Sequence, residues 1–572
     1  MRDYESFFSE KEIVRYLAQK RAKAAKDIHD NQFLRNISKN AEKPFDPENR
    51  KNIYKYFPPR NDWIRFRKRE RKSYNNSKSL NAAQIERTVW REHKRVMKGA
   101  IEAPEWYQEM FGLIDEIQDK ALNYSSKKRL SSPKLIPVVK NEAKNTYRLI
   151  CSFESLCDRV LITQSSRYLT EIFDPLFEEC SFAFRSKHNE KKFTHHLAVR
   201  EIIEYKSKYD SQRLYASECD IQKFYDSINH SVIRKCFQNL IGILRTQNIN
   251  VDKRAINLFN AYLDCYAFNE DVYPKEKKIL KKHGIKKGRI AWVAPLDLKS
   301  VGSKIEEGRI GVPQGGALSC LIANIVLDFA DKKILDLNFS SLFYARFCDD
   351  IIIIHSRKKK CRKAYDEYLK SLKELKLIAH PAEYFKTYNA NFWGIKTKEP
   401  YVWNRVNKNH RLAKKNVPWL AFVGYQLRYD GLLRVRPDSI QKELEKQVEE
   451  ANKVIESLPD ENSKRLNKKN IIFRFSQRLI AMSVGRVNSE NPSMCWASGF
   501  NVLKDNPVRK WQLRKLDKNR NLQISRIKNH LKDFNDSTSN GYTKEDQPRY
   551  RDYYGPPYSY YYQFLESKKN ND

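Results

Sequence analysis

Two adjacent aspartates, Asp349 and Asp350, lie between two apolar runs, and this arrangement constrains the fold more than any other feature of the sequence. Residues 344–347 and 351–354 on either side are typical of β-strands, so the pattern predicts a hairpin with the acids at or beside its turn. Adjacent strand residues point to opposite faces, so only one carboxylate can fully face a given site. Burying charged carboxylates among isoleucines costs free energy unless a cation balances their charge. An ordinary polar turn, the alternative, would not need apolar residues on both sides.

A third aspartate, Asp220, ends another β-like run, residues 214–220, before the chain turns toward a helix that begins near Ser227. Together with Asp349 and Asp350 it offers the hard oxygen ligands that Mg²⁺ prefers, and Mn²⁺ suits the same ligands. Two such ions about 4 Å apart activate an attacking hydroxyl and stabilise a departing oxygen. The three acids therefore indicate nucleotidyl transfer.

A glycine-containing segment lies between the two acidic segments. Pro313-Gln314-Gly315-Gly316 precedes a run to Leu327 whose 3.6-residue apolar period predicts a buried helix. Glycine allows close approach of the backbone to a ligand. By itself this segment could be an ordinary connection between a loop and a helix. Its place between Asp220 and Asp349 makes it a specific indication of a functional segment.

In this order the three segments resemble motifs A, B and C of the reverse transcriptase palm. Residues 380–387 resemble motif D, residues 422–425 resemble motif E, and two upstream stretches, 147–150 and 181–185, are similar to the fingers of bacterial enzymes. The resemblance covers about residues 130 to 440. It implies an α+β fold of the right-hand polymerase type, with fingers and palm, and RNA-directed DNA polymerase activity.

The resemblance also implies a role for each matching position. Asp220 and Asp349 would be the principal catalytic metal ligands, assisted by the Ile221 carbonyl, with Asp350 as the supporting carboxylate. Tyr225 would collide with a 2′-hydroxyl and so select dNTPs. The other implied positions are the nucleotide and template contacts Gln314, Gly315, Arg148 and Lys140, the pyrophosphate-protonating Lys386, and the primer grip of Phe422, Gly424 and Tyr425.

Two positions depart from the family pattern. Phe347-Cys348 stands where a tyrosine and a variable residue usually precede the paired aspartates, which removes a hydroxyl and places a thiol beside the expected primer end. Cys320 replaces the proline that is common after the motif B serine. Neither change removes a metal ligand, so we expect activity to survive.

The formal net charge of +39 indicates a polyanionic partner. Phosphate contacts release counterions, so binding to nucleic acid should weaken steeply with salt. A lysine-rich soluble protein is the alternative explanation for the charge alone. A strongly basic insertion, residues 274–289, predicts a surface loop near nucleic acid.

Composition and periodicity divide the chain into four parts. A basic helical N-terminal extension spans residues 1–125, and fingers and palm span 126–436, with the basic insertion at about 270–305. A helical, thumb-like region follows at 437–532, then a polar, tyrosine-rich C-terminal tail at 533–572.

The ten cysteines contain no Cys-x-x-Cys pair, which argues against a zinc site. No apolar run is long enough for a bilayer and no signal region is visible, so we expect a cytoplasmic protein without a membrane partner.

The motif E tail, residues 429–440, and the two extensions resemble bacterial abortive-infection and other "unknown group" reverse transcriptases. That resemblance implies anti-phage defence, an RNA template such as a dedicated non-coding RNA, a DNA product, dNTPs, and a homo-oligomer or partner defence protein. Some relatives start synthesis on a protein hydroxyl, for which Ser559 or residues 558–562 are candidates; packing of an aromatic tail is the simpler reading. Alternatives remain open: a group II intron or retron-type enzyme, a template-independent DNA polymerase, an RNA-dependent RNA polymerase suggested by Asp226, and a non-catalytic RNA-binding scaffold.

Overall fold

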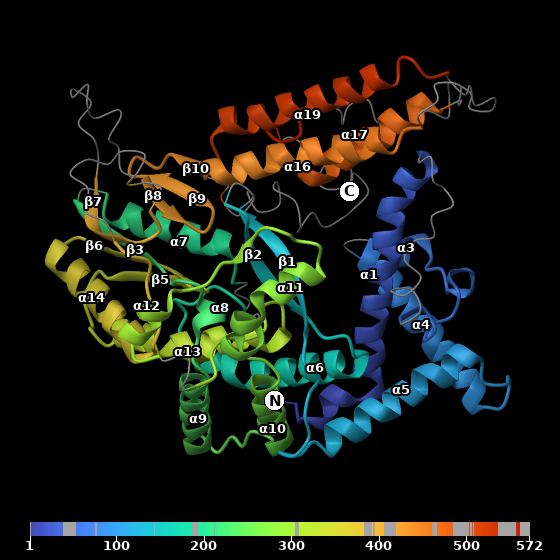
Figure 1. Ribbon diagram of the computed structural model, residues 1–572, viewed down its shortest axis with the longest axis horizontal. Coiled ribbons are helices and arrows are strands. Elements are labelled where there is room, and N and C mark those ends of the chain that lie inside the picture. The colour runs from blue at the N-terminus through green and yellow to red at the C-terminus, as the bar shows by residue number, and fades with distance from the viewer. Residues whose placement is uncertain are drawn as a thin grey trace. The chain divides into compact units, whose positions relative to one another are not determined.

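The computed structural model mixes helices with three small sheets, as an α+β fold requires (Figure 1). It describes residues 2–37, 53–71, 73–74, 77–141, 144–185, 193–210, 212–303, 308–382, 392, 395–404, 419–459, 466–483, 503, 506, 508–535 and 556–560. The chain forms two compact units. Unit one comprises residues 1–13, 113–423 and 427–431, and unit two comprises residues 14–112, 424–426 and 432–572.

A four-stranded antiparallel sheet forms the centre of unit one. Its strand order is β5-β6-β3-β7. The strands are β3 (Leu214–Asp220), β5 (Phe343–Phe347), β6 (Asp350–His355) and β7 (Lys398–Trp403). The four isoleucines of β6 are fully buried, so the apolar run that follows the paired aspartates is a central strand of the core.

Helices cover this sheet. Helix α14 (Lys358–Glu374) packs against β3, β6 and β7, and α13 (Ala317–Leu335) packs against α14 (Figure 1). Helix α13 is the buried helix predicted after the glycine segment: it carries buried residues around its whole circumference and also contacts α6 (Leu156–Phe173) and α9 (His230–Thr246). The other helices of this unit include α7 (His195–Lys208), α8 (Phe224–Ser227), α10 (Lys253–Asp264), α11 (Glu276–Lys282) and α12 (Pro295–Ser300).

A second, three-stranded sheet of unit one has the order β1-β2-β4. Strands β1 (Lys134–Asn141) and β2 (Thr146–Ser152) form an antiparallel hairpin, and the short β4 (Arg289–Ile290) pairs with β2 in parallel. The basic insertion is therefore not the simple surface loop that its sequence predicts, because it contains α11 and supplies β4.

The first residues of the chain pack on α6 within unit one. They form the short helix η1 (Glu5–Phe8), in which Phe7 and Phe8 are buried, and the Tyr4 hydroxyl lies 3.0 Å from the Ser165 hydroxyl. Arg2 adds an ion pair with Glu171 at 2.7 Å.

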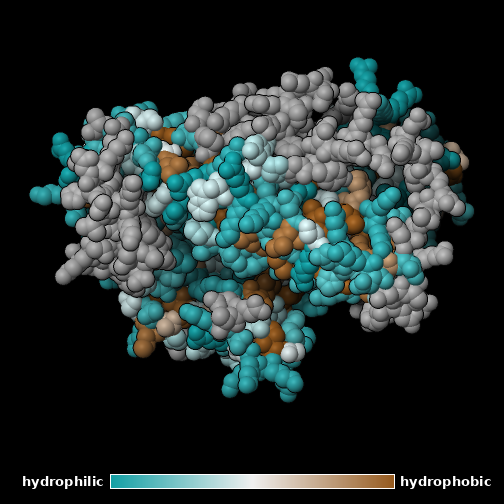
Figure 2. Space-filling model, turned by 90° about the horizontal axis from the view of Figure 1, so that it is seen from above, coloured by the Kyte–Doolittle hydropathy of each residue, from teal (hydrophilic) through white to brown (hydrophobic). Residues whose placement is uncertain are grey.

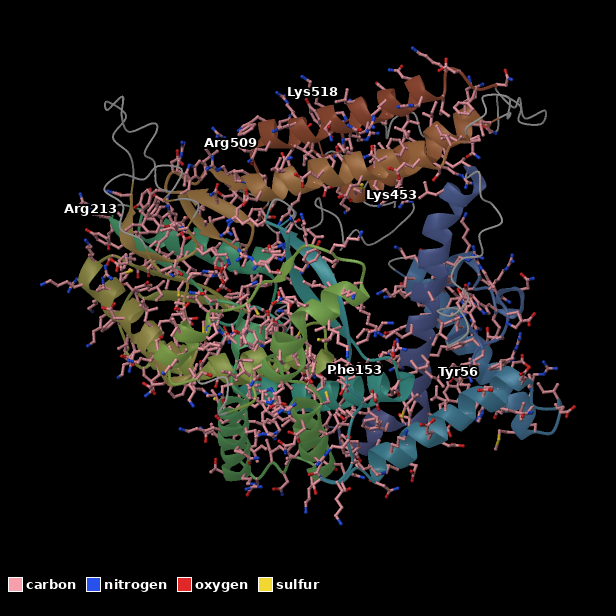
Figure 3. All side chains as sticks on the ribbon, in the orientation of Figure 1. Tyr56, Phe153, Arg213, Lys453, Arg509 and Lys518 are labelled. Atoms are coloured by element: carbon pink, nitrogen blue, oxygen red, sulfur yellow. The ribbon has the colours of Figure 1, made fainter. Side chains whose placement is uncertain are left out.

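Unit two is mainly helical. Its C-terminal helices α16 (Pro437–Glu456), α17 (Lys468–Ser483) and α19 (Lys510–His530) share one apolar core that includes Val454, Phe475 and Ile527. Lys453 and Lys518 are cationic side chains on α16 and α19 (Figure 3). Unit two also contains α3 (Lys68–Arg71), α4 (Ser77–Met97), β10 (Leu433–Val435), the short helix η2 (Arg60–Asp62) and most of α1 (Glu10–Ile37).

The elements not yet named belong to unit one or are divided between the units. Strand β8 (Trp419–Phe422) and the short helices η3 (Asp174–Leu176), η4 (Phe268–Val272) and η5 (Tyr273–Lys275) lie in unit one, whereas α5 (Glu105–Leu122) and β9 (Tyr425–Arg428) each have residues in both units.

Hydrophilic residues prevail on the surface seen in Figure 2, with smaller hydrophobic areas between them. In the described part of the chain, no helix combines the length and the apolar character that crossing a bilayer demands.

Candidate active site

The predicted hairpin is present, and it brings the acidic segments to one end of the central sheet. Strands β5 and β6 are joined by Cys348 and Asp349, and Phe347 pairs with Asp350 in the ladder. Cys348 has a φ of +60°, a left-handed conformation that a tight turn requires. On the other side of β6, Asp350 pairs directly with Asp220, the last residue of β3. Segments more than a hundred residues apart in the sequence therefore place their aspartates together.

Negative charge is concentrated at this edge of the sheet. Burial raises the pKa of Asp349, and the negative charge of Asp220 raises it further. Lys396 forms an ion pair with the Asp220 carboxylate. The Asp220 backbone is fixed as well: its carbonyl accepts from the His380 N–H at 2.8 Å, and its own N–H donates to the Thr397 hydroxyl at 3.3 Å.

The donor set suits a divalent cation. Asp220 and Asp349 are hard oxygen donors close enough to repel one another, and a bound cation would relieve that repulsion. Within the described ranges, however, no three acidic, histidine or cysteine side chains are already gathered around one metal position. The Lys396 ammonium instead balances the charge of Asp220.

Tyr225 lies against the turn between β5 and β6. Lys223, with a left-handed φ of +48°, starts the short helix α8 that carries Tyr225. The Tyr225 hydroxyl lies 3.3 Å from the Cys348 sulfur. The thiol that departs from the family pattern thus contacts the residue predicted to select the sugar.

Gln314 joins the glycine segment to two neighbouring elements. Its side-chain amide donates to the Asp226 carboxylate at 3.0 Å, and its carbonyl accepts from the Cys151 N–H of β2 at 2.8 Å. Gly315 has a φ of +94°, which favours glycine. At Gly316 a Cβ atom would lie 1.8 Å from the Tyr262 hydroxyl, so no side chain fits there.

Lysines gather on one side of Asp220: Lys396 pairs with its carboxylate, and Lys223 lies near Lys396. Lys140 of β1, exposed at the end of the fingers hairpin, comes close to Lys223. Burial lowers the pKa of Lys223, and the charge of Lys140 lowers it further. Burial also lowers the pKa of His380, with the charge of Lys396 as the next cause. Such a cluster of cations beside two carboxylates suits a polyphosphate held together with metal ions.

A comparison with protein families identifies the part of the chain that contains Asp349 and Asp350. Residues 267–401 match the family described as "Reverse transcriptase (RNA-dependent DNA polymerase)". The chain contains a reverse transcriptase domain. The match includes Gln314, Asp349 and Asp350, and the domain is accordingly that of a nucleotidyltransferase.

Solved structures with weak overall similarity include two yeast telomerases. Telomerase from Candida albicans, in complex with a TWJ fragment of telomeric RNA, is 11% identical with a TM-score of 0.29, over 80% of this chain and 73% of that one. Apo telomerase from Candida tropicalis is 13% identical with a TM-score of 0.33, over 77% and 68%. No curated protein matches the sequence.

The structure describes five more of the predicted site residues and leaves one outside its described ranges. Arg148 is exposed on β2, and Ile221 is buried directly after Asp220. Phe422 ends β8 in a buried position, Gly424 has a φ of +88°, and Tyr425 begins β9 and is buried. Lys386 lies outside the described residues. The roles of all these residues stay predictions.

A buried hydrogen-bond network beneath the turn that carries Asp349 was missed by the sequence analysis. Arg346 pairs with Asp331 of α13 through Nη2 at 2.6 Å, and both side chains are fully buried. Its Nη1 donates to the Asn324 side-chain oxygen at 3.1 Å and to the Cys348 carbonyl at 3.2 Å. A charged arginine inside an apolar strand was the available signal, because such a charge needs a buried partner.

Proposed function

We propose that this chain copies RNA into DNA at the edge formed by Asp220 and Asp349, adding dNTPs to a primer hydroxyl by two-metal nucleotidyl transfer. One observation carries the proposal: Asp220 pairs in register with Asp350 while Asp349 occupies the adjoining turn, and residues 267–401, which include Asp349 and Asp350, match the reverse transcriptase family. Asp350 would support the two principal ligands, Asp220 and Asp349.

The residues around this edge can be assigned to metal binding and to triphosphate binding. Asp220 and Asp349 would hold Mg²⁺ or Mn²⁺, which when bound activates the primer hydroxyl and stabilises the leaving oxygen. Lys140, Lys223 and Lys396 would face the triphosphate, because Lys396 pairs with Asp220 and Lys223 lies near both Lys396 and Lys140. Lys396 would leave Asp220 when metal and nucleotide arrive.

Sugar and base are assigned to other residues. The Tyr225 ring, held at Cys348, would exclude the 2′-hydroxyl. Gln314 and Gly315 would line the nucleotide and template base, with Arg148 reaching from β2. Lys386 would protonate the pyrophosphate, and Phe422, Gly424 and Tyr425 would hold the primer end.

An RNA-making polymerase, the rival suggested by Asp226, has less support. The Asp226 carboxylate is buried and accepts a hydrogen bond from Gln314, and burial raises its pKa. It is therefore engaged inside the protein and does not offer a second acid to the nucleotide.

We favour a nucleic-acid primer over a tail hydroxyl. Tyr558 is buried and its hydroxyl donates to Glu443 at 2.6 Å, while the Ser559 hydroxyl donates to Asp517 at 2.7 Å. Mass spectrometry of the tail peptide after incubation with dNTPs tests this assignment. A nucleotide adduct on residues 558–562 would contradict it.

We further propose that the enzyme acts in the cytoplasm in anti-phage defence, with a dedicated non-coding RNA as template and with a second copy or a defence protein as partner. The motif E tail and the long extensions support this placement by resemblance. A retron-type or group II intron enzyme, or a template-independent polymerase, would leave a different copurifying nucleic acid. Sequencing that material with and without phage separates these cases.

Phage protection by the Asp349→Asn variant tests whether defence depends on the chemistry. The matched control is Asp336→Asn, an exposed aspartate just beyond α13. We expect protection to be lost only in Asp349→Asn. Equal protection by both variants and the wild type would instead favour a non-catalytic RNA-binding scaffold.

A further inference from the structure

The basic insertion carries an exposed set of cations that the proposed chemistry does not use. We call residues 275–289 the basic arm. Its exposed side chains include Lys277, Lys278, Lys281, Lys282, Lys286 and Lys287. The one acid of the arm, Glu276, accepts a hydrogen bond from the Ile290 N–H, so its carboxylate holds the backbone at strand β4.

The basic arm is fixed to the fingers hairpin by backbone pairing. Arg289 and Ile290 pair in parallel with Thr146 and Tyr147 of β2, and the Ala291 N–H donates to the Tyr147 carbonyl at 2.9 Å. On the other side, His283 Nε2 lies 3.0 Å from the Leu135 carbonyl of β1. The cations therefore hold a defined position on the fingers sheet.

The same sheet connects the basic arm with the site. At its far end, the Cys151 N–H of β2 donates to the Gln314 carbonyl. Because a strand rises about 3.3 Å per residue, Thr146 lies roughly 17 Å along β2 from Cys151. After the arm, the indole N–H of Trp292 donates to the Asp226 carbonyl at 3.0 Å, which fixes the insertion next to Tyr225 as well.

A solvated lysine face is the ordinary explanation for exposed lysines. Here the lysines outnumber the single acid of their segment, Glu276. Backbone pairing also joins their segment to strand β2, whose Cys151 binds Gln314, the residue expected to line the template base. A polyanionic strand that reaches Gln314 along the fingers would pass them and release counterions.

We propose that the basic arm binds the phosphates of the single-stranded RNA template before it is copied. This inference rests on the proposed function for its choice of ligand. Lysines contact phosphates as point charges without reading bases, so the contact would be independent of template sequence.

The test compares full-length variants in binding to two RNA template–primer duplexes, one blunt and one with a 5′ template overhang of roughly a dozen nucleotides, over a salt series. The arm variant is K281Q/K282Q/K286Q/K287Q, and K281R/K282R/K286R/K287R restores the charge. The matched control is K358Q/K359Q/K363Q/K373Q, which removes four exposed lysines of α14.

The arm variant should bind the overhang duplex at least tenfold more weakly than wild type, with a salt slope reduced by about 3, since each lost single-strand phosphate contact removes about 0.7. The arm variant should bind the blunt duplex as tightly as wild type does. The arginine variant and the α14 control should bind both duplexes as tightly as wild type does. No loss, or an equal loss on both duplexes, would overturn the proposal. A loss shared by the α14 control would overturn it too.

Single-nucleotide extension of a duplex with a one-nucleotide overhang separates this inference from the proposed function. Absence of extension by the wild type would refute the polymerase proposal, while the binding comparison would still decide the role of the basic arm.

Discussion

Tyr225 is the residue that we propose selects the sugar of the incoming nucleotide. Its hydroxyl lies 3.3 Å from the sulfur of Cys348, in the turn between β5 and β6. The ring supplies bulk, whereas the thiol contact fixes where that bulk lies. Removing the ring and removing only the hydroxyl should therefore have different effects.

We predict that Tyr225→Ala relaxes sugar selection. Loss of the ring opens space for a 2′-hydroxyl, and discrimination at a steric pocket is worth about tenfold to a hundredfold. Tyr225→Phe keeps the bulk and should retain most of the discrimination. The measurement is the ratio of kcat/KM for dNTP and rNTP incorporation. An unchanged ratio in Tyr225→Ala would remove Tyr225 from the role of sugar gate.

His230 predicts a dependence of stability on pH. It is buried, its Nε2 lies 2.7 Å from the Gly311 carbonyl, and burial lowers its pKa to about 4. An unfolded histidine titrates near 6.5, so between pH 6.5 and 4 the unfolded state binds the extra proton. The stabilisation is present above pH 6.5 and is lost as the pH falls toward 4.

The matched variant is His230→Gln, which keeps a donor for the Gly311 carbonyl and does not titrate. Between pH 6.5 and 5 the wild type should lose up to about 1.4 kcal/mol more per pH unit than the variant. Melting temperatures measured across this range test the difference. Parallel curves would show that His230 does not contribute to the acid sensitivity.

At the scale of elements, the hairpin of β5 and β6 depends on a buried network with α13. Arg346 Nη2 binds Asp331 at 2.6 Å, the Tyr344 hydroxyl donates to Asp331 at 2.7 Å, and Arg346 also donates to the Cys348 carbonyl. The network thereby ties the motif B helix to the turn that carries Asp349.

Breaking the pair on one side should destabilise the protein, because Arg346→Met leaves Asp331 buried without its partner, at a cost of about 3–5 kcal/mol. Replacing both residues, as in R346M/D331L, should restore much of the stability. The double variant should still polymerise poorly, because nothing holds the Cys348 carbonyl. Chemical denaturation and primer extension measure the two effects, and a stable double variant with wild-type activity would contradict the positioning role.

The elements differ in how well the sequence predicts them. The hairpin around Asp349 and Asp350 and the helix after Gly316 follow local apolar patterns, and both are present. Strand β4 could not be predicted, since it is two residues long and forms only through pairing with β2, far away in the sequence. Lys396 was missed for a related reason, because only the pairing of β7 with β3 brings it to Asp220.

At the scale of the whole molecule, the positive charge can be predicted from the sequence, whereas the division into two units cannot. The net charge of +39 is read directly from composition. That residues 1–13 belong with unit one is a matter of tertiary packing, in which Tyr4 and Phe7 are buried. No local pattern in a helical N-terminal region distinguishes those residues from the ones that follow.

The central claim is that a two-carboxylate edge in a reverse transcriptase domain makes DNA on an RNA template, and primer extension by the purified full chain tests it most directly. With Mg²⁺, dNTPs and an RNA template, the wild type and Asp336→Asn should make DNA complementary to the template. A chelator should abolish synthesis, and Asp349→Asn should lower it by at least about a hundredfold. Failure of the wild type to make template-complementary DNA, or equal synthesis by Asp349→Asn, would contradict the account.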